Sequence, residues 1–223
     1  MKREYQRHLP HQVPAGFPIF LTWNLKGAMP REANERLRRE REQLQREPPR
    51  AGESTRDRAL RHGKLLFAKS DDFLDRATAG PMHLRDPACA KIVEDAILFG
   101  AAGRYELFAW CVMANHVHLL VTPRWELSKV TQSLKGFTAY EINRLQSETG
   151  RTFWVDESYD HWARDEEEFQ RIVYYIENNP VKAGLCQRVE DWPWSSARFR
   201  RWWPMGKVLI GEWIARCKHE MSG

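Results

Sequence analysis

The feature that most constrains the fold of this chain is a pair of apolar runs separated by a two-residue break. Residues 104–113 alternate as a strand that is buried on both faces would, and residues 116–121 form a second run of this kind. The break at 114–115 is short enough for a tight turn. Side chains two residues apart on a strand point to the same face, so His116 and His118 are expected side by side. The sequence therefore predicts a β-hairpin that presents two imidazoles on one face.

The faces of this hairpin can be assigned residue by residue if the alternation is regular. On the first strand we expect one face to carry Phe108, Trp110 and Val112 and the other to carry Leu107, Ala109 and Cys111. On the second strand, Leu120 should share the face of the two histidines. Two imidazoles on a rigid strand can hold one metal ion. A lone His-x-His pair on an apolar strand is more often two ordinary histidines, so the hypothesis needs support from elsewhere in the chain.

A helix is expected to begin after Asp165. This residue is a suitable N-cap, and Glu168 stands three residues later, as in a capping box. An apolar stripe at helical spacing follows, formed by Phe169, Ile172, Val173 and Ile176. We expect Pro180 to oppose further helix and Gly184 to fit the turn that follows.

One flank of this helix carries a tyrosine and an asparagine. At about 100° per residue, Tyr175 lies at the edge of the apolar stripe with Asn179 about 40° away, whereas Tyr174 points to the opposite flank. Two imidazoles and the amide oxygen of Asn179 would leave several positions of a six-coordinate ion open, which suits Mg²⁺ or Mn²⁺ better than a closed zinc site. Tyr175 could then attack a metal-bound phosphate. Taken singly, a helical tyrosine is more often core packing, and Asn-Asn-Pro is a helix stop.

The rest of the chain supplies further strands and helices. Residues 17–25 are expected to form a strand, and residues 87–99 and 127–145 are expected to form helices. Two shorter segments, 153–156 and 159–163, are candidates for strands or loops. The alternation of strands with helices predicts an α+β protein.

Arginine and glutamate dominate residues 31–62, a segment interrupted by Pro48-Pro49 and Gly52. Opposite charges recur there at i,i+4 spacing, which favours a solvated helix with ion pairs over a dedicated DNA-binding arm. A helical pattern resumes at residues 65–73.

Composition and length restrict the class of protein. The chain has 223 residues with 42% hydrophobic content, including 10 Trp and 10 Phe, which is enough to bury one core. The 35 Lys and Arg against 30 acidic residues give a net charge of +5, compatible with a polyanionic partner but weak evidence for one. The four dispersed cysteines are typical of reduced thiols in the cytosol. With no signal-peptide core and no long apolar run, we expect a cytoplasmic protein.

Six segments in a fixed order carry a family resemblance. They are Asn115-His-Val-His118, Lys135-Gly-Phe-Thr138, Trp154, Asp160-His-Trp-Ala-Arg-Asp165, Tyr174-Tyr-Ile-Glu-Asn-Asn-Pro-Val-Lys-Ala-Gly184 and Trp192-Pro-Trp-Ser-Ser-Ala197. In these segments the chain resembles the REP-associated tyrosine transposases, single-tyrosine members of the HUH superfamily. The resemblance covers most of the chain and implies a bacterial protein.

The resemblance implies a fold, an activity and a set of site residues. The expected fold is a ferredoxin-like antiparallel sheet with flanking helices, the core of HUH endonucleases. The expected activity is cleavage and rejoining of single-stranded DNA beside short palindromic hairpins, with Mg²⁺ or Mn²⁺ and a 5′-phosphotyrosine intermediate. His116, His118 and Asn179 match the metal ligands and Tyr175 matches the nucleophile. The chain would act as a monomer or a homodimer.

Two stretches lie beyond the compact family pattern. We expect one domain over residues 1–223, with an arginine-rich helical insertion at about 31–80 and a C-terminal extension at about 198–223. The insertion either contacts DNA or shields the sheet. Rings and arginines alternate at Arg198–Trp203 and could stack bases, although packing of these rings onto the core is favoured. The candidate DNA contacts are Lys135, His161, Arg198, Arg200 and Arg201.

Two other functions remain open. One is an HUH nickase of replication or transfer that does not rejoin ends. The other is a domesticated protein that binds DNA hairpins without strand transfer, against which the presence of all four site residues argues.

Overall fold

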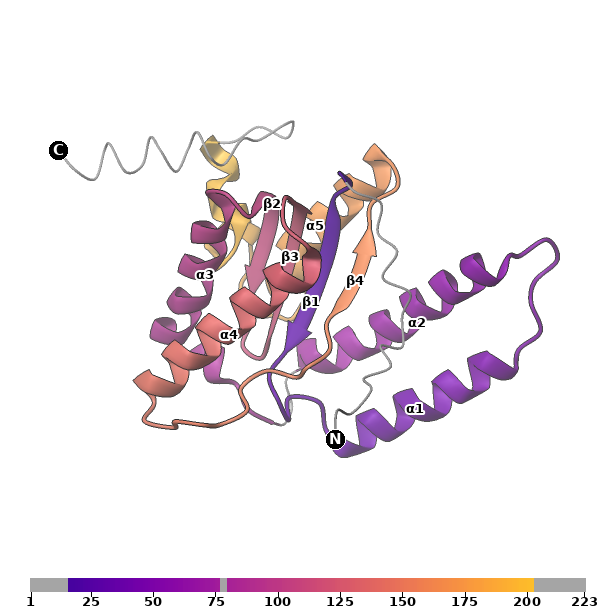
Figure 1. Cartoon of the computed structure of the whole chain (residues 1–223), viewed down its shortest axis with the longest axis horizontal. Coiled ribbons are helices and arrows are strands. Elements are labelled where there is room, and N and C mark those ends of the chain that lie inside the picture. The colour runs from indigo at the N-terminus through magenta and orange to yellow at the C-terminus, as the bar shows by residue number, and fades with distance from the viewer. Residues whose placement is uncertain (1–15, 77–79, 203–223) are drawn as a thin grey trace.

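The computed structural model describes residues 16–76 and 80–202 of the chain. Figure 1 shows a central sheet with helices on both of its faces and a long helical hairpin at one side. Within the described residues, no helix is long and apolar enough to cross a membrane.

The sheet has four antiparallel strands in the order β2-β3-β1-β4. The strands are β1 (Ile19–Asn24), β2 (Tyr105–Val112), β3 (His116–Pro123) and β4 (Tyr159–Trp162). Helices connect β1 to β2 and β3 to β4, while β2 and β3 form the predicted hairpin. This is the split βαβ arrangement of ferredoxin-like folds, so the expected fold class is confirmed.

Helices cover the two faces of the sheet unequally. On one face lie α3 (Pro87–Ala101), preceded by the short 3₁₀ helix η1 (His83–Arg85), and α4 (Leu127–Leu145), and the larger hydrophobic core fills the space beneath them. On the other face lies α5 (Glu166–Lys182), whose apolar stripe packs on a smaller cluster around Phe20 and Leu120. The histidines of β3 therefore point toward the α5 side, as the shared face with Leu120 predicts.

The regular alternation expected for β2 was wrong at one position. The pairing with β3 shifts between Leu107 and Ala109, because Leu107 lies opposite Val121 while Ala109 lies opposite Leu120. Such a β-bulge adds one residue to a strand and reverses the faces before it. Leu107 consequently joins Trp110 in the larger core, and Phe108 joins the α5 side.

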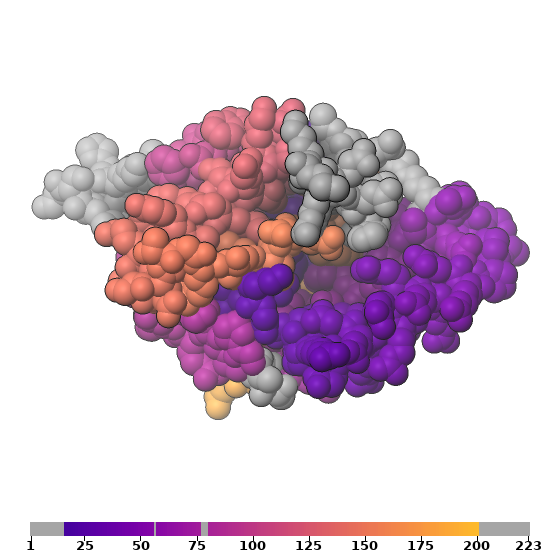
Figure 2. All heavy atoms as spheres, turned by 60° about the horizontal axis from the view of Figure 1, so that its bottom comes forward, coloured from indigo at the N-terminus to yellow at the C-terminus, as the bar shows by residue number. Residues whose placement is uncertain are grey.

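The predicted insertion forms a helical hairpin of α1 (Arg31–Arg46) and α2 (Thr55–Arg76). Ion pairs lie along it, such as Arg31 with Glu35 at 3.0 Å within α1 and Lys69 of α2 with Glu40 of α1 at 2.5 Å. In the space-filling view of Figure 2, the two helices form a broad lobe at one side of the molecule. The last turns of α2 reach back to the sheet, where Leu74 is buried in the larger core.

The expectation that the last predicted helix stops at Pro180 was also wrong. Helix α5 continues through Pro180 to Lys182, since a proline removes only its own donor and the next turn closes through the Ala183 amide, 2.9 Å from the Asn179 carbonyl oxygen. Gly184 then adopts a positive φ of 71°, as the predicted turn requires.

The segment after α5 folds back on the core. It contains the short 3₁₀ helices η2 (Val189–Asp191) and η3 (Ser196–Trp202). The Trp192 indole nitrogen donates to the Val112 carbonyl oxygen at 3.1 Å, and the Phe199 ring lies 5.7 Å from that of Trp110. These two rings therefore pack the segment after α5 onto the sheet, and Trp203 lies outside the described residues.

Candidate active site

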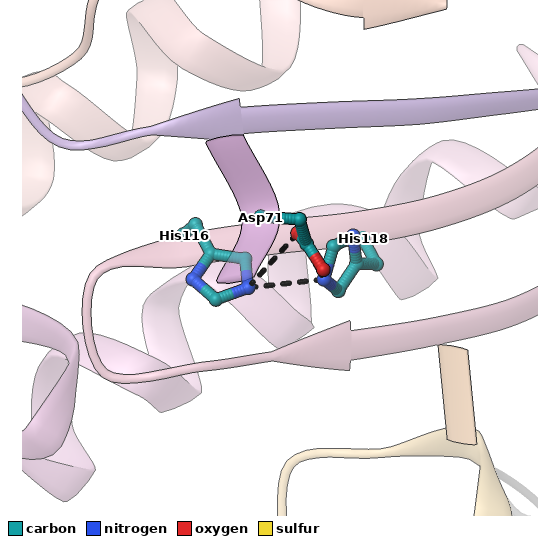
Figure 3. Close-up of side chains that lie close together, drawn as sticks. All are labelled: Asp71, His116 and His118. Carbon is teal, nitrogen blue, oxygen red and sulfur yellow. Dashed lines mark hydrogen bonds and ion pairs between the residues drawn. The ribbon is translucent and has the colours of Figure 1, made fainter. Parts of the chain in front are cut away.

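Strand β3 places the two imidazoles against each other in the interior. His116 and His118 are both fully buried, and their Nε2 atoms lie 3.0 Å apart (Figure 3). Burial lowers the pKa of each ring to about 3, so both are neutral at neutral pH.

Hydrogen bonds to the Nδ1 atoms of the two imidazoles indicate which ring nitrogen carries the proton and which keeps a lone pair. The Nδ1 atom of His116 is 2.7 Å from the Asn115 side-chain oxygen, while the Asn115 amide nitrogen donates to the Leu74 carbonyl oxygen at 3.0 Å. The oxygen of Asn115 must therefore accept, which puts the His116 proton on Nδ1 and leaves a lone pair on Nε2. The Thr22 hydroxyl, 2.7 Å from Nδ1 of His118, allows the same tautomer there. Two facing lone pairs favour a cation between them.

A carboxylate from the insertion completes this group. Asp71 of α2 is buried, and its Oδ1 atom lies 3.4 Å from Nε2 of His118 and 3.8 Å from Nε2 of His116 (Figure 3). Asp75, one turn later, brings its own Oδ1 atom to 3.6 Å from Nε2 of His116. Sequence reasoning missed both residues. Two acids four residues apart near an apolar stretch were the only signal, and they also suit a solvated helix.

The side chains gathered here could hold a metal ion. Among the described residues, the Oδ1 atoms of Asp71, Asp75 and Asn179 are buried and accept no hydrogen bond. Ligand atoms of Asp71, His116 and His118 all lie within 4.8 Å of one another. The amide nitrogen of Asn179 is drawn 3.1 Å from Nε2 of His118, and exchanging the nitrogen and oxygen of this amide would turn the oxygen toward the same point. Nitrogen and oxygen donors gathered in this way could hold a metal ion.

Helix α5 brings Tyr175 to the same point. Its ring centroid lies 5.6 Å from that of His118, and its hydroxyl donates a short hydrogen bond to Oδ2 of Asp71. Burial and the Asp71 carboxylate raise the pKa of Tyr175 far above its ordinary value. Tyr174, by contrast, is 69% exposed. The structure thus brings together the four residues named from the sequence and places the neighbouring tyrosine in solvent.

Asp75 of α2 forms an ion pair with Lys182 of α5. The Nζ atom of Lys182 lies 2.7 Å from Oδ2 of Asp75. Burial and repulsion from Asp71 nevertheless raise the pKa of Asp75 to about 6. The two acids and Lys182 therefore form one electrostatic unit beside the imidazoles.

His161 does not join the candidate metal group. Its Nε2 atom lies 2.9 Å from Oε1 of Glu168, which also receives Lys64 at 2.8 Å and, at Oε2, Arg164 at 2.8 Å. Burial alone would raise the pKa of Glu168, but these hydrogen bonds hold it below its ordinary value. The predicted capping box forms in part: Asp165 caps the Glu168 amide at 2.7 Å, while the Glu168 side chain turns to the other partners.

The other candidate DNA contacts lie in structural contacts. Lys135 donates to the Asp156 carbonyl oxygen at 2.9 Å. Arg198 pairs with Glu94 at 2.7 Å and Arg200 with Glu177 at 2.6 Å. The side chain of Arg201 lies outside the described residues. A role of these residues in DNA binding stays a prediction.

A family model matches the part of the chain that holds four of the candidate site residues. Residues 96–179 match the family model of IS200-like transposases, a span that holds His116, His118, Tyr175 and Asn179. Over 105 residues the chain is 30% identical to a candidate REP-associated tyrosine transposase of Haemophilus influenzae, covering 41% of this chain and 58% of that protein. Over 93 residues it is 27% identical to the REP-associated tyrosine transposase of Escherichia coli, covering 41% and 54%. The chain thus spans little more than half the length of these relatives.

Two solved structures are also similar. One is a REP-associated tyrosine transposase bound to a REP hairpin, with a TM-score of 0.45, 17% identity and coverage of 92% of this chain and 89% of that one. The other is a candidate transposase of Deinococcus radiodurans, with a TM-score of 0.33, 18% identity and coverage of 76% and 95%. The sequence matches confirm the resemblance to the REP-associated tyrosine transposases. Asp71 and Asp75 lie outside the span that the family model matches.

Proposed function

We propose that this chain cleaves and rejoins single-stranded DNA beside short palindromic hairpins, with Tyr175 as the nucleophile. The observation that carries the proposal is the position of the Tyr175 hydroxyl, which donates a hydrogen bond to Asp71 beside the two imidazoles. A half-buried tyrosine that served only the core would not need three unpartnered oxygens and two facing nitrogens near it.

Four residues would hold a divalent cation, Mg²⁺ or Mn²⁺. They are His116, His118 and Asn179, with Asp71 as a carboxylate that the sequence did not suggest. When bound, the cation would supply positive charge to a phosphate and so ease attack by an oxygen nucleophile. The neutral imidazoles leave nitrogen lone pairs ready for it, and Asn115 fixes the tautomer of His116.

The chemical step is a transfer of a phosphoryl ester to Tyr175. The phenolic oxygen forms a bond to phosphorus, and the bond from phosphorus to the 3′ oxygen breaks. The proton that the tyrosine loses balances the proton that the departing 3′ oxygen gains. The product is a 5′-phosphotyrosine, which retains the energy of the ester, so a 3′ hydroxyl can reverse the step and rejoin a strand.

A covalent adduct on a denaturing gel tests the proposal. The protein is incubated with labelled single-stranded oligonucleotides that carry the hairpins flanking its own gene, with Mg²⁺, Mn²⁺ or EDTA. We expect a metal-dependent DNA-linked band that Tyr175→Phe abolishes. Tyr174→Phe is the matched control, because that neighbour is 69% exposed and should leave the band intact. A band that survives in Tyr175→Phe would refute the assignment.

Strand transfer is tested separately. A second oligonucleotide with a free 3′ hydroxyl is added after the adduct has formed, and a joined product is sought. Its absence would assign the chain to nicking alone. Hairpin binding without any adduct would instead indicate a binding protein.

A further inference from the structure

The candidate site is closed in this structure. His116 and His118 are 0% exposed, and Asp71 and Asn179 are 1% exposed. A phosphate in a DNA strand therefore has no path to the imidazoles unless a part of the protein moves.

Helix α2 is the element that crosses the site. Along it, Lys64 meets Glu168 at 2.8 Å, Asp71 receives the Tyr175 hydroxyl, and Asp75 meets Lys182 at 2.7 Å. The partners follow one another along α5 in the same order, so side chains join α2 to α5 at three levels.

The polar contacts between α2 and α5 can be replaced by contacts with water or with DNA. Within α2, the residues that the structure describes as buried are Asp71, Leu74 and Asp75, whereas α5 buries a continuous apolar stripe. Phe67 of α2, which is half-buried, also packs on the rings of Tyr159, Phe20 and Tyr175. An element that fully buries one apolar side chain among its described residues belongs to the part of a fold that opens at low free-energy cost.

The contacts of the Asp71 carboxylate are those that a phosphate under attack requires. It is an anion, it accepts the hydrogen bond of Tyr175, and its other oxygen lies 3.4 Å from Nε2 of His118. A scissile phosphate must likewise present one oxygen to the metal ligands and its phosphorus to the tyrosine oxygen. The carboxylate and the phosphate cannot both occupy this position.

We propose that the Asp71 carboxylate marks the binding position of the scissile phosphate, and that α2 is a cover which the single strand displaces. The proposal rests on the proposed function. In the closed state Asp71 serves as a ligand, and the phosphate takes over its place when α2 withdraws. Withdrawal also separates Lys64 from Glu168 and Lys182 from Asp75, which leaves Lys182 of α5 as an unpaired cation beside the entering strand.

Lys64→Ala tests the cover without altering any residue of the site. Lys64 is 41% exposed, and Glu168 keeps Arg164 and His161 after the change, so the fold should persist. We expect the adduct to form about two- to fivefold faster at saturating Mn²⁺, the effect of removing one half-exposed ion pair from the closed state. Lys91→Ala, which removes the exposed pair with Asp95 on α3, is the matched control and should leave the rate unchanged. A slower or unchanged rate in Lys64→Ala would overturn the proposal.

Asp71→Asn tests the position of the phosphate without requiring activity. In EDTA, a fluorescent hairpin oligonucleotide should bind Asp71→Asn at least about tenfold more tightly than wild type, since a like charge leaves the phosphate position. Equal or weaker binding would show that Asp71 does not occupy that position. Hydrogen exchange of wild type should meanwhile show faster exchange in α2, and not in α5, when the oligonucleotide binds. Slower exchange in α2 would contradict the cover.

The two proposals can fail separately. If neither wild type nor Lys64→Ala forms an adduct, the proposed function fails, while the binding and exchange measurements still decide whether α2 opens. If the adduct forms but Lys64→Ala slows it, the proposed function stands and the cover does not.

Discussion

Asp71 and Tyr175 are 104 residues apart in the sequence, yet the carboxylate of one accepts the hydroxyl hydrogen bond of the other. The same carboxylate lies at the imidazoles of β3. Helix α2, which lies between β1 and α3 in the sequence, is thus joined to residues within the span that the family model matches.

Thr22→Val should weaken metal binding although Thr22 is not a candidate ligand. Its hydroxyl lies 2.7 Å from Nδ1 of His118 and orients that ring. Loss of such a partner typically lowers metal affinity about 10- to 100-fold. Titration of Mn²⁺ by calorimetry measures the effect. The control is Thr131→Val, whose hydroxyl bonds only to carbonyl oxygens of its own helix; equal affinities in the two variants would contradict the assignment.

Acid should destabilise the metal-free protein through its buried imidazoles. The pKa of His118 falls from 6.5 to about 3 on folding, so the unfolded chain binds more protons between these pH values. Stability is therefore present above about pH 6.5 and is lost as pH falls, by up to about 1.4 kcal/mol per pH unit for each ring. The pKa of Asp75 is instead raised on folding, from 3.8 to about 6, so between these pH values the folded chain binds more protons at this residue. Asp75 therefore stabilises the folded protein as the pH falls through this range.

A variant separates these contributions. Urea unfolding in EDTA from pH 5 to pH 8 should give a shallower pH dependence for His118→Gln than for wild type, since Asp75 is common to both. The expected difference in slope below pH 6 is about 1 kcal/mol per pH unit. Parallel stability curves would show that the ring is not neutral in the folded protein.

Glu168→Gln should lower stability more than the same change at the preceding residue. Glu168 accepts from Lys64, His161 and Arg164, whereas Glu167 pairs only with Arg171 on an exposed face. Removing the charge should cost about 1–3 kcal/mol of unfolding free energy at Glu168 and less than about 1 kcal/mol at Glu167. Urea unfolding of both variants decides the point, and equal losses would contradict the prediction.

Local periodicity predicted the elements on which the site is built. The hairpin, the helix at 127–145 and the flank that carries Tyr175 all follow from spacing within one segment, because side-chain direction repeats with a fixed period in strands and helices. The bulge after Leu107 does not follow from it, since an extra residue leaves no mark in an apolar run. The continuation of α5 through Pro180 depends on hydrogen bonds made beyond it.

Asp71 could not be predicted for a different reason. The residues around it are typical of a solvated, arginine-rich helix, and its contact with His118 depends on how α2 packs against strand β3. No spacing within the chain encodes such packing between distant segments. Within the segment predicted to be an insertion, α2 contacts the candidate site through Asp71 and α1 packs against α2, while a role of this segment in DNA binding stays a prediction.

The amide of Asn115 joins two parts of the protein that would otherwise be independent. Its nitrogen binds the Leu74 carbonyl oxygen on α2, and its oxygen holds Nδ1 of His116. When α2 moves, this amide loses its anchor and the His116 ring loses its fixed orientation. By reciprocity, an ion that fixes the ring also favours the docked helix. Binding of an ion at the site and docking of α2 are then coupled, so a change in one equilibrium is expected to change the other by the same free energy.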